Sequence, residues 1–171
     1  MLEDHLARLE VIVGRNATSR WAAIFEWMGS ATVIERLIFG APDPNVRYCK
    51  RRAAYVVVIR NAKVAMVGSK QKHFLPGGGS MPGEAPEETV VREVHEELAR
   101  GVRLIRSLGE ATQYFYSADD DRHYKMTATF FAGDFIDDVY GSGEHQLDWL
   151  SITETDRACF HECHAWAVRQ A

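Results

Sequence analysis

Residues 77–102 read GGGSMPGEAPEETVVREVHEELARGV, and this stretch decides the fold. Three glycines open it, and a run rich in glutamate follows. Pro86 suits the first turn of a helix, where its missing N–H is not needed, and Gly101 suits the position just after a helix end. The pattern predicts a helix over about residues 85–100.

The acidic residues of this predicted helix gather on one side. Glu93, Glu96 and Glu97 stand at i, i+3 and i+4 and share a face. Like charges at this spacing cost some tenths of a kcal/mol per pair, so a compensating partner is expected. Mg²⁺ and Mn²⁺ prefer such oxygen ligands. A solvated acidic surface helix is the alternative. The opposite side of the helix is expected to face the core, with Val91, Val94 and Leu98.

The spacing of these residues resembles the Nudix box, G-x5-E-x7-R-E-U-x-E-E-x-G-U, in which U is aliphatic. The last glycine and aliphatic positions of the box fall on Ala99 and Arg100, and Gly101-Val102 come two residues later. We therefore expect the helix to run about two residues further, because Ala continues a helix where Gly stops it. The matching positions are Gly78, Glu84, Arg92, Glu93, Val94, Glu96 and Glu97.

The resemblance implies a Nudix fold, an α/β/α sandwich with a mixed β-sheet. It also implies Mg²⁺- or Mn²⁺-dependent hydrolysis of a pyrophosphate bond in a nucleoside diphosphate linked to another group. ADP-ribose, dinucleoside polyphosphates and oxidised nucleoside triphosphates all remain open as substrates. By motif position it implies metal ligands at Glu93, Glu96 and Glu97, with the Gly77 carbonyl as a further ligand. The alternative function is a non-catalytic Nudix-fold nucleotide-binding or sensor module.

Two further roles are assigned within this pattern. Arg92 is expected to hold a glutamate in place, with Glu84 as its motif partner and Glu88 one turn back. The general base has two candidates, Glu93 and Glu144. Glu144 lies in the Gly-rich segment GSGEHQLDWL, which resembles the late part of many Nudix chains, and a mobile loop acid reaches the reacting water when the loop closes. An exposed loop glutamate with no such role is the alternative.

Substrate contact is assigned to Gly78 and to the aromatic stretch QYFYS, with Tyr114 and Tyr116 as stacking candidates, because every nucleobase offers a π-face. In an alternating strand half of these aromatic residues must instead point into the core. The segment CFHECH at 159–164 mixes metal-ligand residue types, but its spacing is that of ordinary helical neighbours, so a zinc site is disfavoured.

The rest of the chain predicts a mixed α/β order of strands, helix, strands and helix. The Pro-rich break at 41–45 separates an N-terminal helical extension, residues 1–44, from the Nudix domain, residues 45–171. Two hairpins, a late strand and a closing helix capped by Thr153 are expected in the domain. The strand ranges are 53–60 with 63–69, joined by Asn61-Ala62, then 102–117 with 123–135, and 147–152.

The N-terminal extension carries an apolar stripe at helical spacing. We expect this stripe to pack against the domain body or against a second subunit, which makes a homodimer compatible with the sequence. The stripe consists of Trp21, Ile24, Phe25 and Met28.

The composition and charge of the chain limit which other functions it can have. The chain has 171 residues, 46% of them hydrophobic and 26% charged, which is typical of a globular protein. A net charge of −4 offers no basic surface for bulk nucleic acid, so a small nucleotide diphosphate is the expected partner. No segment has the makeup of a signal peptide or a membrane span. Three cysteines without CxxC spacing favour a reduced, cytoplasmic setting.

Overall fold

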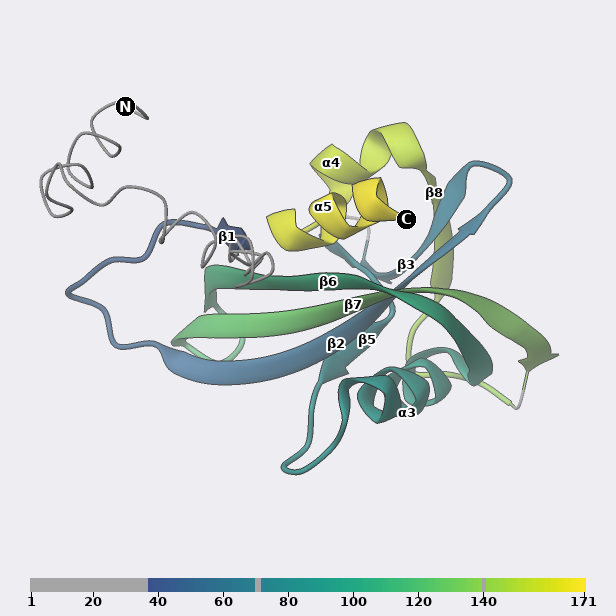
Figure 1. Ribbon diagram of the computed structural model, residues 1–171, viewed down its shortest axis with the longest axis horizontal. Coiled ribbons are helices and arrows are strands. Elements are labelled where there is room, and N and C mark those ends of the chain that lie inside the picture. The colour runs from purple at the N-terminus through teal and green to yellow at the C-terminus, as the bar shows by residue number, and fades with distance from the viewer. Residues whose placement is uncertain (1–36, 70–71, 140) are drawn as a thin grey trace, which may run out of the picture. The chain divides into compact units, whose positions relative to one another are not determined.

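The computed structural model describes residues 37–69, 72–139 and 141–171, which build a mixed β-sheet with helices on both faces (Figure 1). The apolar stripe predicted from Trp21 to Met28 lies outside the described residues. Within the described part, no helix is long and apolar enough to cross a membrane. The strands are β1 (Leu37–Phe39), β2 (Cys49–Arg60), β3 (Lys63–Ser69), β4 (Lys72–Phe74), β5 (Gly77–Gly79), β6 (Arg100–Ser117), β7 (Arg122–Val139) and β8 (Leu147–Ser151).

The strands join in the order β1-β6-β7-β2-β3-β4, while β5 pairs with β2 and β8 pairs with β3. The pairs β1–β6 and β2–β7 are parallel and the others are antiparallel, so the sheet is mixed, as predicted. Strand β1 lies on the N-terminal side of the boundary predicted between residues 44 and 45 and still belongs to the sheet. That boundary stays a prediction.

Both predicted hairpins are present. Strands β2 and β3 pair with Arg60 opposite Lys63, and the two turn residues Asn61 and Ala62 have φ of +51° and +58°. Positive φ at both central residues is the requirement of a tight hairpin turn that matches the twist of its strands. Strands β6 and β7 pair along almost their whole length, with register shifts at three places. These bulges bend the long hairpin.

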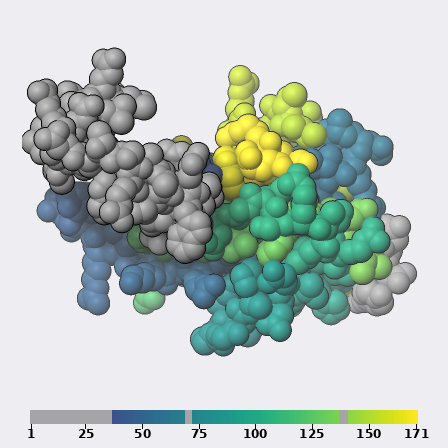
Figure 2. All heavy atoms as spheres, viewed as in Figure 1, coloured from purple at the N-terminus to yellow at the C-terminus, as the bar shows by residue number. Residues whose placement is uncertain are grey.

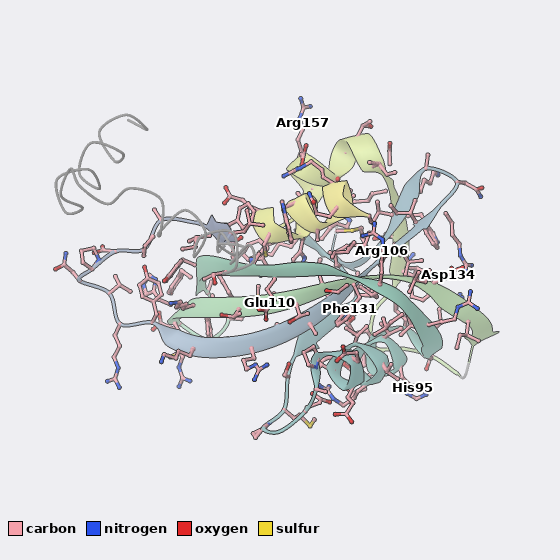
Figure 3. The ribbon with its side chains drawn as sticks, in the orientation of Figure 1. His95, Arg106, Glu110, Phe131, Asp134 and Arg157 are labelled. Carbon is pink, nitrogen blue, oxygen red and sulfur yellow. The ribbon has the colours of Figure 1, made fainter. Side chains whose placement is uncertain are left out.

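The helices divide the core into two layers. Helix α3 (Pro86–Leu98) covers one face of the sheet, and α5 (Glu162–Gln170) covers the other together with the short α4 (Thr155–Ala158) (Figures 1 and 2). Phe131 lies between the sheet and α3, whereas His95 points outward from the helix (Figure 3). The layer under α3 is built from Ala54, Val56, Val58, Val90, Val94, Leu98, Phe131 and Phe135, and that under α5 from Tyr55, Val57, Met126, Phe130, Cys163, Ala167 and Val168.

One residue predicted to face the core under α3 does not do so. Val91 is 48% exposed, and Val90 is buried in its place beside Val94 and Leu98. The prediction was wrong by one position because the glycine strand β5 also packs on this helix and rotates the buried stripe toward Thr89 and Val90.

The predicted extension of this helix is also wrong. α3 ends at Leu98, and Ala99 adopts the left-handed conformation with φ +51° and ψ +38°. A left-handed residue other than glycine costs about 1–2 kcal/mol. Strand β6 begins at Arg100, opposite Val139, so strand pairing overrides the helical preference of Ala99.

The closing helix is interrupted. A 3₁₀ turn, η1 (Ile152–Glu154), precedes α4, and a kink at Cys159–His161 separates α4 from α5. Ser151, rather than the predicted Thr153, is the N-cap residue of the first turn, and its N–H donates to the Glu154 carboxylate. The interruption turns the chain so that His161 reaches the cavity described below.

The β2–β3 turn gives a stability prediction. Ala62→Gly should raise the free energy of unfolding by about 0.5–1 kcal/mol, because glycine adopts positive φ without the strain that alanine suffers. Ala62 is exposed, so little packing is lost. Chemical denaturation measures the effect. Ala118→Gly in the other hairpin tip, where φ is not positive, is the control and should not stabilise the protein. An equal fall in the free energy of unfolding in both variants would contradict the assignment of backbone strain to Ala62.

Candidate functional site

The acidic helix α3 begins at residues that suit its N-terminus. Pro86 occupies the first turn, and Glu87 and Glu88 add negative charge there, which the helix dipole favours. The Glu88 carboxylate accepts the backbone N–H of Ala85 at 2.9 Å. Glu88, one of two partners predicted for Arg92, therefore caps the helix instead.

The glycines of β5 let this helix approach the sheet closely. A Cβ atom at Gly78 would lie 2.5 Å from Oε2 of Glu93, so any larger residue would displace that carboxylate. Gly77 has φ +131°, a conformation that favours glycine, and its N–H donates to Oε2 of Glu97 at 3.0 Å. Strand β5 thus fixes two of the three predicted ligand side chains.

Arg92 connects most of the acidic residues. Its Nε and Nη2 donate to the two carboxylate oxygens of Glu84 at 2.7 and 2.9 Å, a bidentate pair. Nη2 also donates to the Gly79 carbonyl at 3.0 Å. Nη1 donates to Glu93 at 2.9 Å and to Glu96 at 3.0 Å. The geometry is that of the orienting role expected for Arg92, with Glu84 as its main partner.

The surroundings shift the pKa values of two of these carboxyl groups in opposite directions. The hydrogen bonds from Arg92, followed by that from the Met81 N–H, lower the pKa of Glu84 to about 2. Burial raises the pKa of Glu97 to about 8; the N–H of Gly77 opposes that rise, while the neighbouring charges of Glu93, Glu144 and Glu96 add to it. Glu97 has no hydrogen bond to Arg92 and is the least compensated acid of the group.

The donor set suits a hard divalent cation. Three carboxylates lie on one helix face beside a glycine strand, and burial, together with the charges of Glu93, Glu144 and Glu96, raises the pKa of Glu97 there. As the side chains stand, no three acidic, histidine or cysteine groups among residues 37–69, 72–139 and 141–171 converge closely enough to hold an ion. Glu93 and Glu96 each form an ion pair with Arg92 through one carboxylate oxygen.

The loop that carries Glu144 lies at the end of α3. The Glu144 N–H donates to the Glu96 carbonyl at 3.1 Å, and the His145 N–H donates to the Glu97 carbonyl at 2.8 Å. The Glu144 side chain is exposed, and its charge is one of those that raise the pKa of Glu97. The structure therefore brings the second base candidate next to the predicted ligands.

A cavity of about 410 Å³ opens beside the carboxylates. Gly77, Gly78, Glu93 and Glu97 form one side of it. The remainder is aromatic and cationic, with two acids from the β6–β7 turn. Its lining includes Arg51, Lys72, Phe74, Phe115, Asp119, Asp120, His145, Phe160 and His161.

The two tyrosines expected to contact substrate do not line this cavity. Tyr114 packs against Tyr48 at 5.0 Å and lies under the Lys125 ammonium at 5.7 Å. Tyr116 is exposed, and its hydroxyl donates to Asp121 at 2.6 Å. Successive side chains of a strand point to opposite faces, so Phe115, between them, faces the cavity. Phe115 therefore lines the cavity, and substrate contact by Tyr114 and Tyr116 stays a prediction.

Sequence reasoning missed the residues that bound the cavity from other elements. Arg51 comes from β2, Lys72 and Phe74 from β4, and Phe160 and His161 from the kink before α5. Alternation along β2 was a usable signal for Arg51, since it is in phase with the core residues Ala53 and Tyr55. No local pattern marks the kink.

The segment at 159–164 contributes two of its residues, Cys163 and His164, to the buried core. Cys163 and His164 are fully buried, and Nδ1 of His164 accepts the Leu75 N–H at 3.1 Å. Burial lowers the pKa of His161 to about 4 and that of His164 well below its ordinary value, so both imidazoles are neutral. His161 faces the cavity beside Phe115, at a ring distance of 4.5 Å.

Comparison with known proteins gives one family. The model of the NUDIX domain matches residues 50–168. Diphosphoinositol polyphosphate phosphohydrolase 3-alpha of Mus musculus and its Homo sapiens counterpart are each 31% identical to this chain over 124 residues, covering 67% of this chain and 71% of the relative.

Solved structures of similar fold agree. The MutT protein from Methanosarcina mazei has a TM-score of 0.56 at 22% identity, covering 73% of this chain and 95% of that one. An ADP-ribose pyrophosphatase from Streptococcus suis has a TM-score of 0.50 at 15% identity, covering 69% and 88%. At these identities the likeness concerns the fold alone.

The position of Glu97 predicts a pH dependence. A carboxyl with a higher pKa in the folded than in the unfolded protein binds more protons when folded, so stability falls as pH rises from about 4.5 to about 8. Urea denaturation without divalent metal should show wild type losing more stability over this range than Glu97→Gln. Saturating Mg²⁺ should reduce the difference. Parallel curves for the two proteins would contradict the burial of an ionisable Glu97.

Proposed function

Because the chain belongs to the Nudix family, we propose that it hydrolyses a pyrophosphate bond in a nucleoside diphosphate linked to a second group, using Mg²⁺ or Mn²⁺. It is a Nudix pyrophosphohydrolase. The observation that carries the substrate proposal is the cavity, in which the carboxylates of α3 face a lining of aromatic rings and cationic groups.

The acidic side of the cavity would hold the cation. Glu93, Glu96 and Glu97 would supply carboxylate oxygens, and Gly77, whose N–H donates to Glu97, would add its carbonyl. Bound there, the cation would neutralise the diphosphate and lower the pKa of water. Glu97 would bind it as the carboxylate, and the charge of the cation would offset the burial and the neighbouring negative charges that raise the pKa of Glu97.

Arg92 and Glu84 would orient these ligands. The bidentate pair fixes the plane of the guanidinium, and Nη1 then donates to both Glu93 and Glu96. Lysine at this position would keep the charge but lose the fork geometry on which the arrangement depends.

Of the two base candidates, the contacts favour Glu144. Glu93 accepts a hydrogen bond from Arg92 and lies against Gly78, so its carboxylate is already held in place by protein contacts. The exposed Glu144 lies beside the same helix face with its side chain outside the Arg92 network. We therefore propose that Glu144 takes the proton from the attacking water.

The rest of the cavity suits a nucleotide. Phe74, Phe115, Phe160 and His161 offer a set of rings against which a base can stack. The guanidinium of Arg51 makes no ion pair within the described residues and faces the same space as Glu93 and Glu97, where a phosphate would compensate its charge. The similar phosphohydrolases are named for a diphosphoinositol polyphosphate, a substrate without an aromatic face. The aromatic lining favours a nucleotide instead.

A panel of substrates tests the proposal. Purified protein with Mg²⁺ or Mn²⁺ is incubated with ADP-ribose, diadenosine tetraphosphate, oxidised dGTP, a nucleotide sugar and a diphosphoinositol polyphosphate. Metal-dependent release of a nucleoside monophosphate, abolished in Glu97→Gln, is the expected result, and chromatography identifies the bond that is cut. Nucleotide binding without any turnover would instead support the non-catalytic module.

The cavity lining makes a second prediction. Phe115→Ala should raise KM by roughly 5- to 100-fold, because stacking on an aromatic side chain contributes about 1–3 kcal/mol per base. Tyr116→Ala, one residue away on the opposite face, should leave KM within about twofold. Steady-state kinetics on the best substrate of the panel measures both. A larger effect at Tyr116 than at Phe115 would reverse our assignment of the substrate face.

A further inference from the structure

The loop between β7 and β8 caps the C-terminal end of α3. The last four carbonyls of a helix have no partner within the helix. Two of them, those of Glu96 and Glu97, accept the N–H groups of Glu144 and His145 at 3.1 and 2.8 Å. Figure 1 shows the chain passing this helix end on its way from β7 to β8. A segment distant in sequence thus completes the acidic helix.

Gly143 makes this contact sterically feasible. A Cβ atom there would collide with the Glu97 carbonyl oxygen and would lie 2.6 Å from the carbonyl carbon of Glu97 and from Cα of Leu98. All three are backbone atoms, which cannot rotate out of the way. Gly141, in the same loop, differs: its φ is +110°, and a Cβ atom there would meet nothing within 4 Å. Gly143 is therefore required for space, and Gly141 for its backbone conformation.

We propose that Gly143 is a positioning residue for hydrolysis, because it lets residues 143–145 dock on α3 and so fixes Glu144 beside the cation ligands. The inference rests on the proposed function, in which Glu144 is the base. Glu96 and Glu97 have two roles in this proposal. Their side chains would bind the cation, and their backbone carbonyls accept the hydrogen bonds of the loop. Backbone hydrogen bonds thus fix the position of the Glu144 backbone relative to the backbone of the ligand residues.

Amide hydrogen exchange tests the docking without any substrate. In the wild-type protein the N–H groups of Glu144 and His145 should exchange at least about tenfold more slowly than that of Ser142. Gly143→Ala should abolish this protection, and Ser142→Ala, the matched control in the exposed part of the loop, should retain it. Unprotected amides at both positions in the wild type would overturn the proposal.

Kinetics test the link to Glu144. Removing a general base typically costs about 100-fold or more, so Glu144→Gln should lower kcat by that factor. Gly143→Ala should lower kcat at least about tenfold, with KM changed less than kcat, because His145 is the one residue of 143–145 that lines the cavity and the rest of the described lining is left in place. The double variant should be no slower than Glu144→Gln. Losses that multiply in the double variant would mean that Gly143 does not act through Glu144.

A second pair of variants covers the case in which Gly143→Ala does not fold. His145→Pro removes the N–H that donates to Glu97, whereas His145→Ala keeps it. Loss of exchange protection at Glu144 in the proline variant alone supports docking, and equal protection in both variants overturns it.

The failures of the two proposals are distinguishable. Full activity in Glu144→Gln would overturn the role of Gly143 but leave the hydrolase in place. A protein that hydrolyses no substrate while its loop amides stay protected would overturn the proposed function, and with it the catalytic part of this inference.

Discussion

The guanidinium of Arg92 is the interaction on which the site depends. One side chain joins the carboxylates of Glu84, Glu93 and Glu96 and the carbonyl of Gly79, and so ties α3 to the turn before it and to β5. Without it, an acidic helix face would lie against a glycine strand with nothing to offset the repulsion. An exposed ion pair contributes little to stability, but a shared and half-buried one fixes geometry.

Arg92 does not donate a hydrogen bond to Glu97, so the charge of Glu97 is less compensated than the charges of the other acids on this helix face. Three acids have a fixed partner or lie in solvent, whereas Glu97 is partly buried with a single N–H donor and several like charges around it. The fold thus holds an energetically unfavourable carboxylate at Glu97. This residue lines the cavity, and its backbone carbonyl accepts a hydrogen bond from the capping loop. Functional sites commonly hold such groups, because a ligand of opposite charge then gains the full benefit of binding.

The sequence predicted the parts of this protein that depend on local spacing. Both hairpins, the acidic face and the partnership of Arg92 with Glu84 follow from periodicity, turn residues and the box. The errors occur where distant segments decide. Strand β5 rotates the buried stripe from Val91 to Val90, and strand β6 ends the helix at Leu98 although Ala99 would continue it. The stacking candidates Tyr114 and Tyr116 lie outside the cavity lining, whereas Phe115 between them belongs to it, as alternation along the strand allows. The cap formed by residues 143–145 and the kink that places His161 have no local signature.

Strand β2 has a consequence for the order in which the molecule acquires its activity. It pairs with β3 and β5 close by in sequence but also runs parallel to β7, so Val56 lies beside Phe131. Pairings this distant in sequence form late, since a long loop must close first. The cavity also needs His161, from near the C-terminus. On the ribosome, the box helix is therefore made well before the segments that enclose the cavity, and a nascent chain bearing the whole motif has no complete cavity for a nucleotide until residue 161 has been added.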